Sequence, residues 1–112
     1  MNKIHSKFLF LLFVSIFTLR AFGSQILVPM DEGQRDHLKA YGLAYWTLEN
    51  DITIEWLLNY RGGSFLIPHL QRIEEELLVR NISYQILADG QVNRIKSEIA
   101  NPEVNMEVVQ LE

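Results

Sequence analysis

Short apolar runs rich in β-branched residues alternate with longer segments of helical periodicity through most of this chain. The predicted elements are strands over 25–30, 52–58 and 82–86, and helices over 31–50, 68–81 and 89–101. This rhythm is typical of proteins in which parallel strands are joined by right-handed helical crossovers. We therefore predict an α/β fold, a three-layer Rossmann-like β-α-β-α-β-α unit with a short parallel sheet.

The helical segments are each expected to have one apolar face. The residues that recur at helical spacing are Leu38, Tyr41, Gly42, Tyr45 and Leu48 in the first helix, Leu70, Ile73 and Leu77 in the second, and Val92, Ile95 and Ile99 in the third. Gly42 lowers helix propensity, but it is tolerable where a helix lies close against a sheet. Asp31, with Gln34 in capping-box spacing, is the expected N-cap of the first helix, and Asp89 that of the third.

The N-terminus resembles a secretory signal peptide. Lys3 and Lys7 precede an apolar stretch over 8–19, and Ala21-Phe22-Gly23 places small residues at the −3 and −1 positions of a cleavage site. The alternative is a membrane anchor, but the stretch of about 12 residues is shorter than the roughly 20 that span a bilayer. We predict a signal peptide over 1–23, an α/β domain over 24–112, and an exported, periplasmic or extracellular protein.

The charge balance and the absence of cysteine exclude several function classes. Cleavage removes three basic residues and leaves seven against 14 acidic ones, so the net charge is near −7. Such a chain suits neither nucleic acid nor an anionic membrane surface. Without cysteine, it has no disulfide, no thiolate zinc site and no cysteine nucleophile. His37 and His69 lack a second metal ligand at helical spacing, so no metal site is predicted.

The tail beyond Pro102 is apolar at positions that do not continue the helix. These positions are Val104, Met106, Val108, Val109 and Leu111. Three parallel strands leave an exposed edge, which folded proteins usually protect. We therefore expect an N-terminal fragment of a longer protein, with a downstream domain as its partner. The alternative is that the tail covers the sheet edge by itself.

A candidate ligand site lies in the polar segment after the second strand, which is expected to be a strand–turn–helix junction leading to Pro68. Gly62 and Gly63 allow close approach of the backbone, Arg61 suits a carboxylate or phosphate, and Ser64 offers a hydroxyl. Ligands of parallel sheets bind beyond the carboxyl ends of the strands. The predicted ligand-binding residues are Asn59, Arg61, Gly62, Gly63 and Ser64, with Asp31 and Asp89 from the neighbouring loops. A small anion is the expected ligand.

Each of these residues also has a plain structural interpretation. The glycines suit a tight turn that requires positive φ, with Arg61 in solvent. Asp31 and Asp89 stand where helix caps are expected. Ser64 has no evident histidine base, so a hydrolase triad is not supported. No catalytic residue is predicted, and the sequence leaves the cofactor unknown.

Several segments of the chain together resemble a known family. They are Val28-Pro29-Met30-Asp31, His37 to Trp46, Trp56 to Phe65, and Asn105-Met106. They resemble the start of exported bacterial proteins labelled asparagine synthetase B, whose members are considerably longer than this chain. The resemblance covers essentially all of residues 24–112 and implies an amide-metabolising enzyme. True glutamine-dependent asparagine synthetases have a different organisation, with an N-terminal catalytic cysteine and an ATP-pyrophosphatase domain. This chain has no cysteine, so no catalytic residue is carried over from them.

The sequence thus leaves three functional interpretations open. The first is an exported module, inactive alone, that contributes an anion- or carboxylate-binding loop to a larger protein. The second is the N-terminal portion of an amide-metabolising enzyme, as the resemblance implies. The third is a purely structural module in which the glycine turn binds nothing. No complete catalytic constellation distinguishes them.

Overall fold

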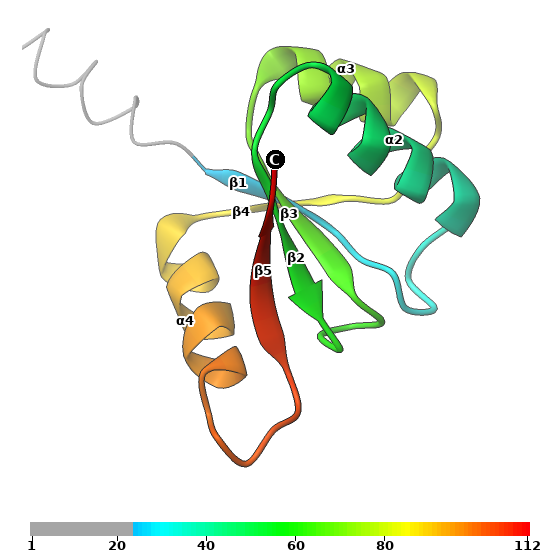
Figure 1. Ribbon diagram of the computed structural model, residues 1–112. Coiled ribbons are helices and arrows are strands. Elements are labelled where there is room, and N and C mark those ends of the chain that lie inside the picture. Colours follow the sequence, from blue (N-terminus) through cyan, green and yellow to red (C-terminus); the bar gives the residue numbers. More distant parts are fainter. Residues whose placement is uncertain (1–23) are drawn as a thin grey trace, which may run out of the picture.

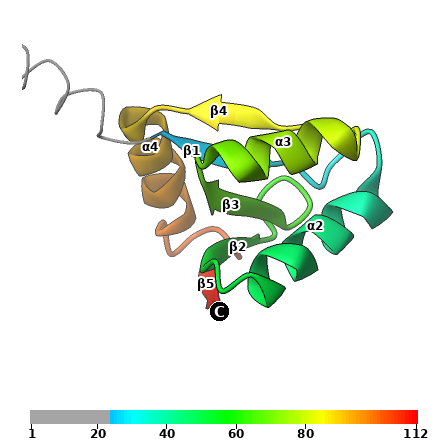
Figure 2. The same cartoon turned by 90° about the horizontal axis from the view of Figure 1, so that it is seen from above.

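A computed structural model describes residues 24–112; residues 1–23, on which the signal-peptide prediction falls, lie outside the described part. The elements in chain order are β1 (Gln25–Val28), α2 (His37–Glu49), β2 (Ile54–Leu58), β3 (Ser64–Pro68), α3 (Gln71–Val79), β4 (Gln85–Leu87), α4 (Asp89–Ile99) and β5 (Glu107–Leu111). The strands form one sheet of order β4-β1-β3-β2-β5. Helices α2 and α3 lie side by side on one face and α4 lies on the other (Figures 1 and 2).

The prediction of a parallel, Rossmann-like sheet is wrong, because every neighbouring pair of strands is antiparallel. The difference arises from β3, which the sequence analysis did not separate from the junction before the second helix. The segment from β1 to β4 follows the order β-α-β-β-α-β, a split arrangement also found in ferredoxin-like folds. Helix α4 and strand β5 are added to this unit.

The polar turn after β2 closes a β-hairpin instead of leading into a helix. Four of its residues have positive φ, namely Asn59 (61°), Arg61 (46°), Gly62 (79°) and Gly63 (87°). This conformation reverses the chain so that β3 pairs with β2, with Trp56 opposite Phe65. Pro68 is the last residue of β3, and α3 begins only at Gln71. The expected strand–turn–helix junction is therefore a hairpin.

Two hydrophobic clusters lie on opposite faces of the sheet, because successive side chains of a strand alternate between its faces. In β1, Ile26 and Val28 face α2 and α3, whereas Leu27 faces α4. The cluster under α2 and α3 also holds Phe65, Ile67, Ile73 and Leu77. The cluster under α4 also holds Leu57, Leu66, Leu87, Val92 and Ile99. The central strands are thus covered on both faces.

Helix α2 buries a different face from the one that its periodicity suggested. Its buried residues are Ala40, Leu43, Ala44 and Thr47. The predicted stripe is largely exposed, with Leu38 82% and Tyr45 66% accessible. The two alanines explain the choice, because small side chains let the helix backbone approach the sheet closely. Tyr41 still reaches the edge of the core, where its ring meets Phe65 edge to face at 6.0 Å.

The predicted inner faces of the other two helices agree better with the structure. Ile73 and Leu77 of α3 and Val92 and Ile99 of α4 are buried, as expected. Leu70 is 42% exposed because it is the N-cap residue of α3 and precedes its first turn. Within residues 24–112, no helix combines the length and apolar character needed to cross a bilayer.

The apolar tail forms β5 and pairs along the whole of β2, with Ile54 opposite Leu111 and Leu58 opposite Glu107. It reaches this position because α4 runs back along the sheet, and the loop after it turns the chain toward β2 (Figure 1). The tail therefore covers the β2 edge, which was the alternative expectation for this segment.

Candidate functional site

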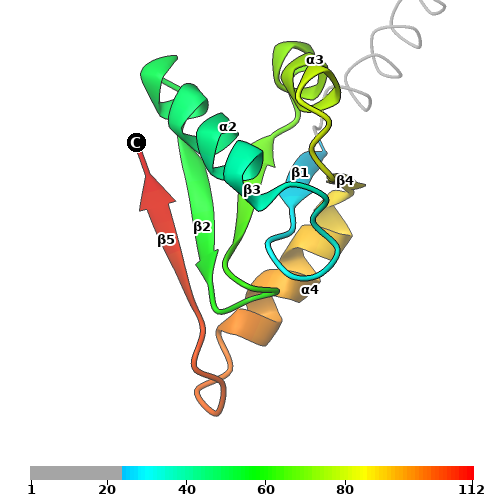
Figure 3. The same cartoon turned by 90° about the vertical axis from the view of Figure 1, so that its right-hand side faces the viewer.

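Asp31 and Arg61 form an ion pair where the β1–α2 loop meets the β2–β3 hairpin, and we call this region the hairpin corner. Arg61 Nε donates to Asp31 Oδ2 at 2.7 Å, and Nη2 donates to Oδ1 at 3.2 Å. The backbone joins the same two segments, because Met30 N donates to Arg61 O at 3.1 Å. Figure 3 shows the loop lying beside the hairpin turn. The guanidinium that was expected to hold an external anion is thus engaged by a carboxylate of the chain.

Electrostatics keep both members of this pair ionised. Hydrogen bonds from Arg61, and then from the Gly33 amide, hold the pKa of Asp31 below its ordinary value. The bond to Asp31 raises the pKa of Arg61. Both side chains are about one third exposed. The pair has no net charge, which lowers its attraction for a free anion.

The two glycines of the corner are required by the chain itself. A Cβ on Gly62 would stand 2.4 Å from the Met30 carbonyl oxygen, far closer than van der Waals contact allows. The Gly63 carbonyl accepts a hydrogen bond of 3.0 Å from the Trp56 indole, and a Cβ there would lie 3.0 Å from the same indole nitrogen. The Met30 backbone therefore lies against Gly62, and the Trp56 side chain lies against Gly63.

The remaining predicted site residues do not converge on a ligand at this corner. Ser64 is fully buried and donates to the Arg61 carbonyl at 3.1 Å. Asn59 donates to the Asn105 carbonyl at 2.8 Å, which links the hairpin to the loop before β5. Asp89 opens α4 at the opposite end of the sheet, because β4 ends beside Gln25, where β1 begins. The antiparallel sheet therefore separates two loops that a parallel sheet would bring together.

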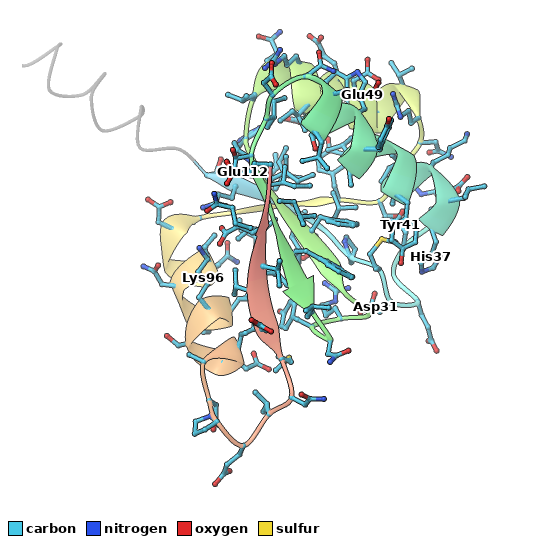
Figure 4. All side chains as sticks on the ribbon, in the orientation of Figure 1. Asp31, His37, Tyr41, Glu49, Lys96 and Glu112 are labelled. Atoms are coloured by element: carbon cyan, nitrogen blue, oxygen red, sulfur yellow. The ribbon has the colours of Figure 1, made fainter. Side chains whose placement is uncertain are left out.

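His37, for which the sequence predicted no metal-binding role, is exposed and belongs to this corner. His37 Nε2 lies 3.0 Å from the carbonyl oxygens of both Met30 and Asp31. Figure 4 labels Asp31, His37 and Tyr41, which lie in the same region of the molecule. Asp36, not Asp31, caps α2, by accepting from the Lys39 amide. No local sequence pattern predicts the His37 contacts, because they depend on how the loop over 29–36 folds back.

A second group of polar side chains, here called the polar chain, lies at the other end of the sheet. Ser24 Oγ lies 2.5 Å from His69 Nδ1, and His69 Nε2 lies 2.7 Å from Glu74 Oε1. Tyr84 donates to the other Glu74 oxygen at 3.1 Å. Hydrogen bonds from His69 and then Tyr84 lower the pKa of Glu74. Burial, followed by the bond to Glu74, raises the pKa of Tyr84.

A hollow of about 490 Å³ lies beside the polar chain. Ser24 and His69 line it, whereas Glu74 is not among its lining residues. No sequence pattern predicts this site, because Ser24 stands beside the predicted cleavage point and 45 residues from His69. Within the described part of the chain, no group of three or more carboxylates and histidines is arranged to hold a metal ion.

Comparisons with known proteins add no identity to this geometry. No protein-family model, no curated protein and no solved structure matches the chain.

The depressed pKa of Asp31 predicts a pH dependence of stability. A carboxyl whose pKa is lowered on folding adds stability above its unfolded pKa, about 3.9, and this is lost as the pH falls through the lower folded value. We expect Asp31→Asn to be less stable than the native chain at pH 7, and the difference to shrink as the pH falls below about 4. Urea unfolding of both chains between pH 7 and pH 2 measures this. A difference that stays constant would contradict the assigned role of the pair.

Proposed function

We propose that residues 24–112 form a structural module of an exported protein, in which the hairpin corner fastens the β1–α2 loop to the β2–β3 hairpin. The observation that carries this proposal is the two-bond contact between Arg61 and Asp31. Two-bond pairs of guanidinium and carboxylate are geometrically specific as well as strong. The hairpin corner holds two segments of the chain together, because the Arg61 guanidinium donates to the Asp31 carboxylate.

Other contacts support the same role. The Arg61 carbonyl accepts from the Met30 amide and from the buried Ser64 hydroxyl. His37 Nε2 lies 3.0 Å from the carbonyl oxygens of Met30 and Asp31 in the loop, and Gly62 packs directly on the Met30 carbonyl. Side chain and backbone of the same segment therefore hold the loop from several directions. This redundancy is typical of a structural contact, whereas a ligand loop needs donors that are left available.

Anion binding at Arg61 is the competing proposal, and one observation favours it. The Arg61 side chain is 31% exposed, and its contacts with Asp31 use Nε and Nη2, so Nη1 takes no part in the pair. An anion would have to bind beside the Asp31 carboxylate, and that proximity opposes binding. Amide chemistry, which the resemblance implies, gains nothing from this corner, since the Ser64 hydroxyl is bonded to backbone.

A double-mutant cycle tests the structural role. We expect Arg61→Gln and Asp31→Asn each to lower the urea midpoint, and the double variant to be little less stable than the worse single variant. The reason is that each single change already removes the same contact. The melting temperature of the native chain should be the same in acetate or phosphate as in sodium chloride of equal ionic strength.

Two results would decide against the structural module. One is additive loss of stability in the double variant, which would mean that the two side chains act separately. The other is a rise in melting temperature with acetate or phosphate that disappears in Arg61→Gln. That second result would establish the anion-binding loop instead. Arg35→Gln is a matched control, because Arg35 is exposed and bonds Asn81 away from this pair.

A further inference from the structure

We propose that Ser24, His69 and Glu74 form an acyl-accepting site at the edge of the hollow. Ser24 is the nucleophile, His69 its base, and Glu74 the positioning residue that orients the imidazole. They come from three separate segments: the residue before β1, the residue after β3, and the first turns of α3. This inference goes beyond the structural role of the hairpin corner, which lies at the other end of the sheet.

The hydrogen bonds of the polar chain have a defined direction. An ionised carboxylate only accepts hydrogen bonds, so Glu74 accepts one from His69 Nε2–H and another from the Tyr84 hydroxyl. In the neutral imidazole, Nδ1 is then the unprotonated nitrogen and accepts from Ser24 Oγ. This is the tautomer that a general base requires. Either ring nitrogen can serve as the base when a carboxylate binds the other.

The electrostatics of Glu74 support this arrangement. Its pKa is lowered by the hydrogen bonds from His69 and Tyr84, which favours the ionised carboxylate. A fixed carboxylate 2.7 Å from Nε2 also stabilises the imidazolium that forms when Nδ1 takes a proton. The side chains of His69 and Glu74 are 27% and 29% exposed, so solvent screens the pair only in part. The base and its orienting group are therefore in place before any ligand binds.

The lining of the hollow suits a neutral acyl ester with hydrogen-bonding groups. Its other lining residues combine amides and a hydroxyl with apolar side chains, and include Gln25, Thr53, Leu66, Pro68, Leu70 and Gln110. Its one carboxylate, Glu55, is paired with Lys96 at 2.9 Å. The volume falls within the range of small-molecule sites. Ser24 and His69 line the hollow, so a carbonyl carbon bound there can approach the hydroxyl.

The proposed reaction transfers the acyl group of the ester first to Ser24 and then to water. Ser24 Oγ attacks the ester carbonyl, and its proton passes to His69 Nδ1. The tetrahedral adduct collapses, the leaving alcohol takes that proton, and an acyl ester remains on Ser24. Water then attacks the acyl group and gives a proton to His69. The acid is released as Ser24 recovers this proton.

The test uses p-nitrophenyl acetate as the probe, with release of p-nitrophenolate followed by absorbance. We expect an acetyl ester on Ser24 Oγ, located by mass spectrometry of the peptide that contains it and removed by alkaline hydroxylamine, which leaves an acetyl amide on an α-amino group in place. Ser24→Ala and His69→Gln should each slow the reaction by about a hundredfold or more, the usual range for loss of a nucleophile–base pair. Glu74→Gln should also slow it, whereas Glu74→Asp should recover part of the rate, since it restores the carboxylate.

Matched controls separate this chemistry from general surface reactivity. Ser97→Ala changes an exposed serine of α4, and Glu75→Gln changes the exposed carboxylate next to Glu74. Neither should alter the rate. An acetyl group found elsewhere in the native chain, or equal rates for the native chain and Ser24→Ala, would overturn the proposal. The position of the acetyl group is read in the native chain, so this outcome does not depend on how any variant folds.

Discussion

Replacing Gly62 with alanine should lower the free energy of unfolding by roughly 3 kcal/mol or more. Two effects add at this position. Its φ of +79° is unfavourable for any residue with a Cβ, and the new methyl group would stand 2.4 Å from the Met30 carbonyl oxygen. The obstacle is backbone held by the Met30–Arg61 hydrogen bond, so it cannot rotate away as a side chain would. Urea unfolding followed by circular dichroism gives the measurement.

Gly90→Ala is the matched control for this experiment. Gly90 is the second residue of α4, and a Cβ there has no neighbour within 4 Å. Alanine should therefore stabilise the protein by roughly 0.4–1 kcal/mol, because it restricts the unfolded chain and favours the helix. If Gly62→Ala proved as harmless as Gly90→Ala, the close packing of the hairpin corner would be refuted.

Leu43→Ala should be the other strongly destabilising change, with an expected loss of about 2–5 kcal/mol. Leu43 is fully buried in the cluster between α2 and the sheet, and alanine would leave a cavity there. Leu38→Ala in the same helix should stay within about 0.5 kcal/mol, because Leu38 is 82% exposed. Both substitutions make the same chemical change within one helix, so their contrast reports which face of α2 is buried. Equal losses would contradict the observed orientation.

The local elements were largely predictable from the sequence, because they follow local preferences. The expected strand over 52–58 contains β2, and the expected helix over 89–101 contains α4. Strand β3 was missed because Pro68 fits the first turn of a helix as well as the end of a strand. Omitting one strand of a hairpin reverses the inferred direction of all that follows. The antiparallel sheet was therefore beyond what the rhythm of elements could predict.

For the two polar sites, the sequence indicated some of the residues but not their contacts. Asp31 and Arg61 were both singled out, and the structure brings them together, but as partners of each other. Their pairing depends on the hairpin, which no spacing between positions 31 and 61 reveals. Ser24 and His69 meet for the same reason, since β1 pairs with β3 and places Gln25 opposite Pro68. Pairing between distant segments is decided by the global packing of strands, and a single sequence carries little signal for it.

The length of β3 sets the distance between the hairpin corner and the polar chain. Its five residues run from the hairpin corner to the residue before His69, and strands rise about 3.4 Å per residue, so about 14 Å of stiff sheet separates the two regions. Beyond about 10 Å, substitutions that share no partners have nearly independent effects. A chain carrying both Arg61→Gln and His69→Gln should therefore show the stability change of one superimposed on the reactivity change of the other. The protein's two ends can be altered separately.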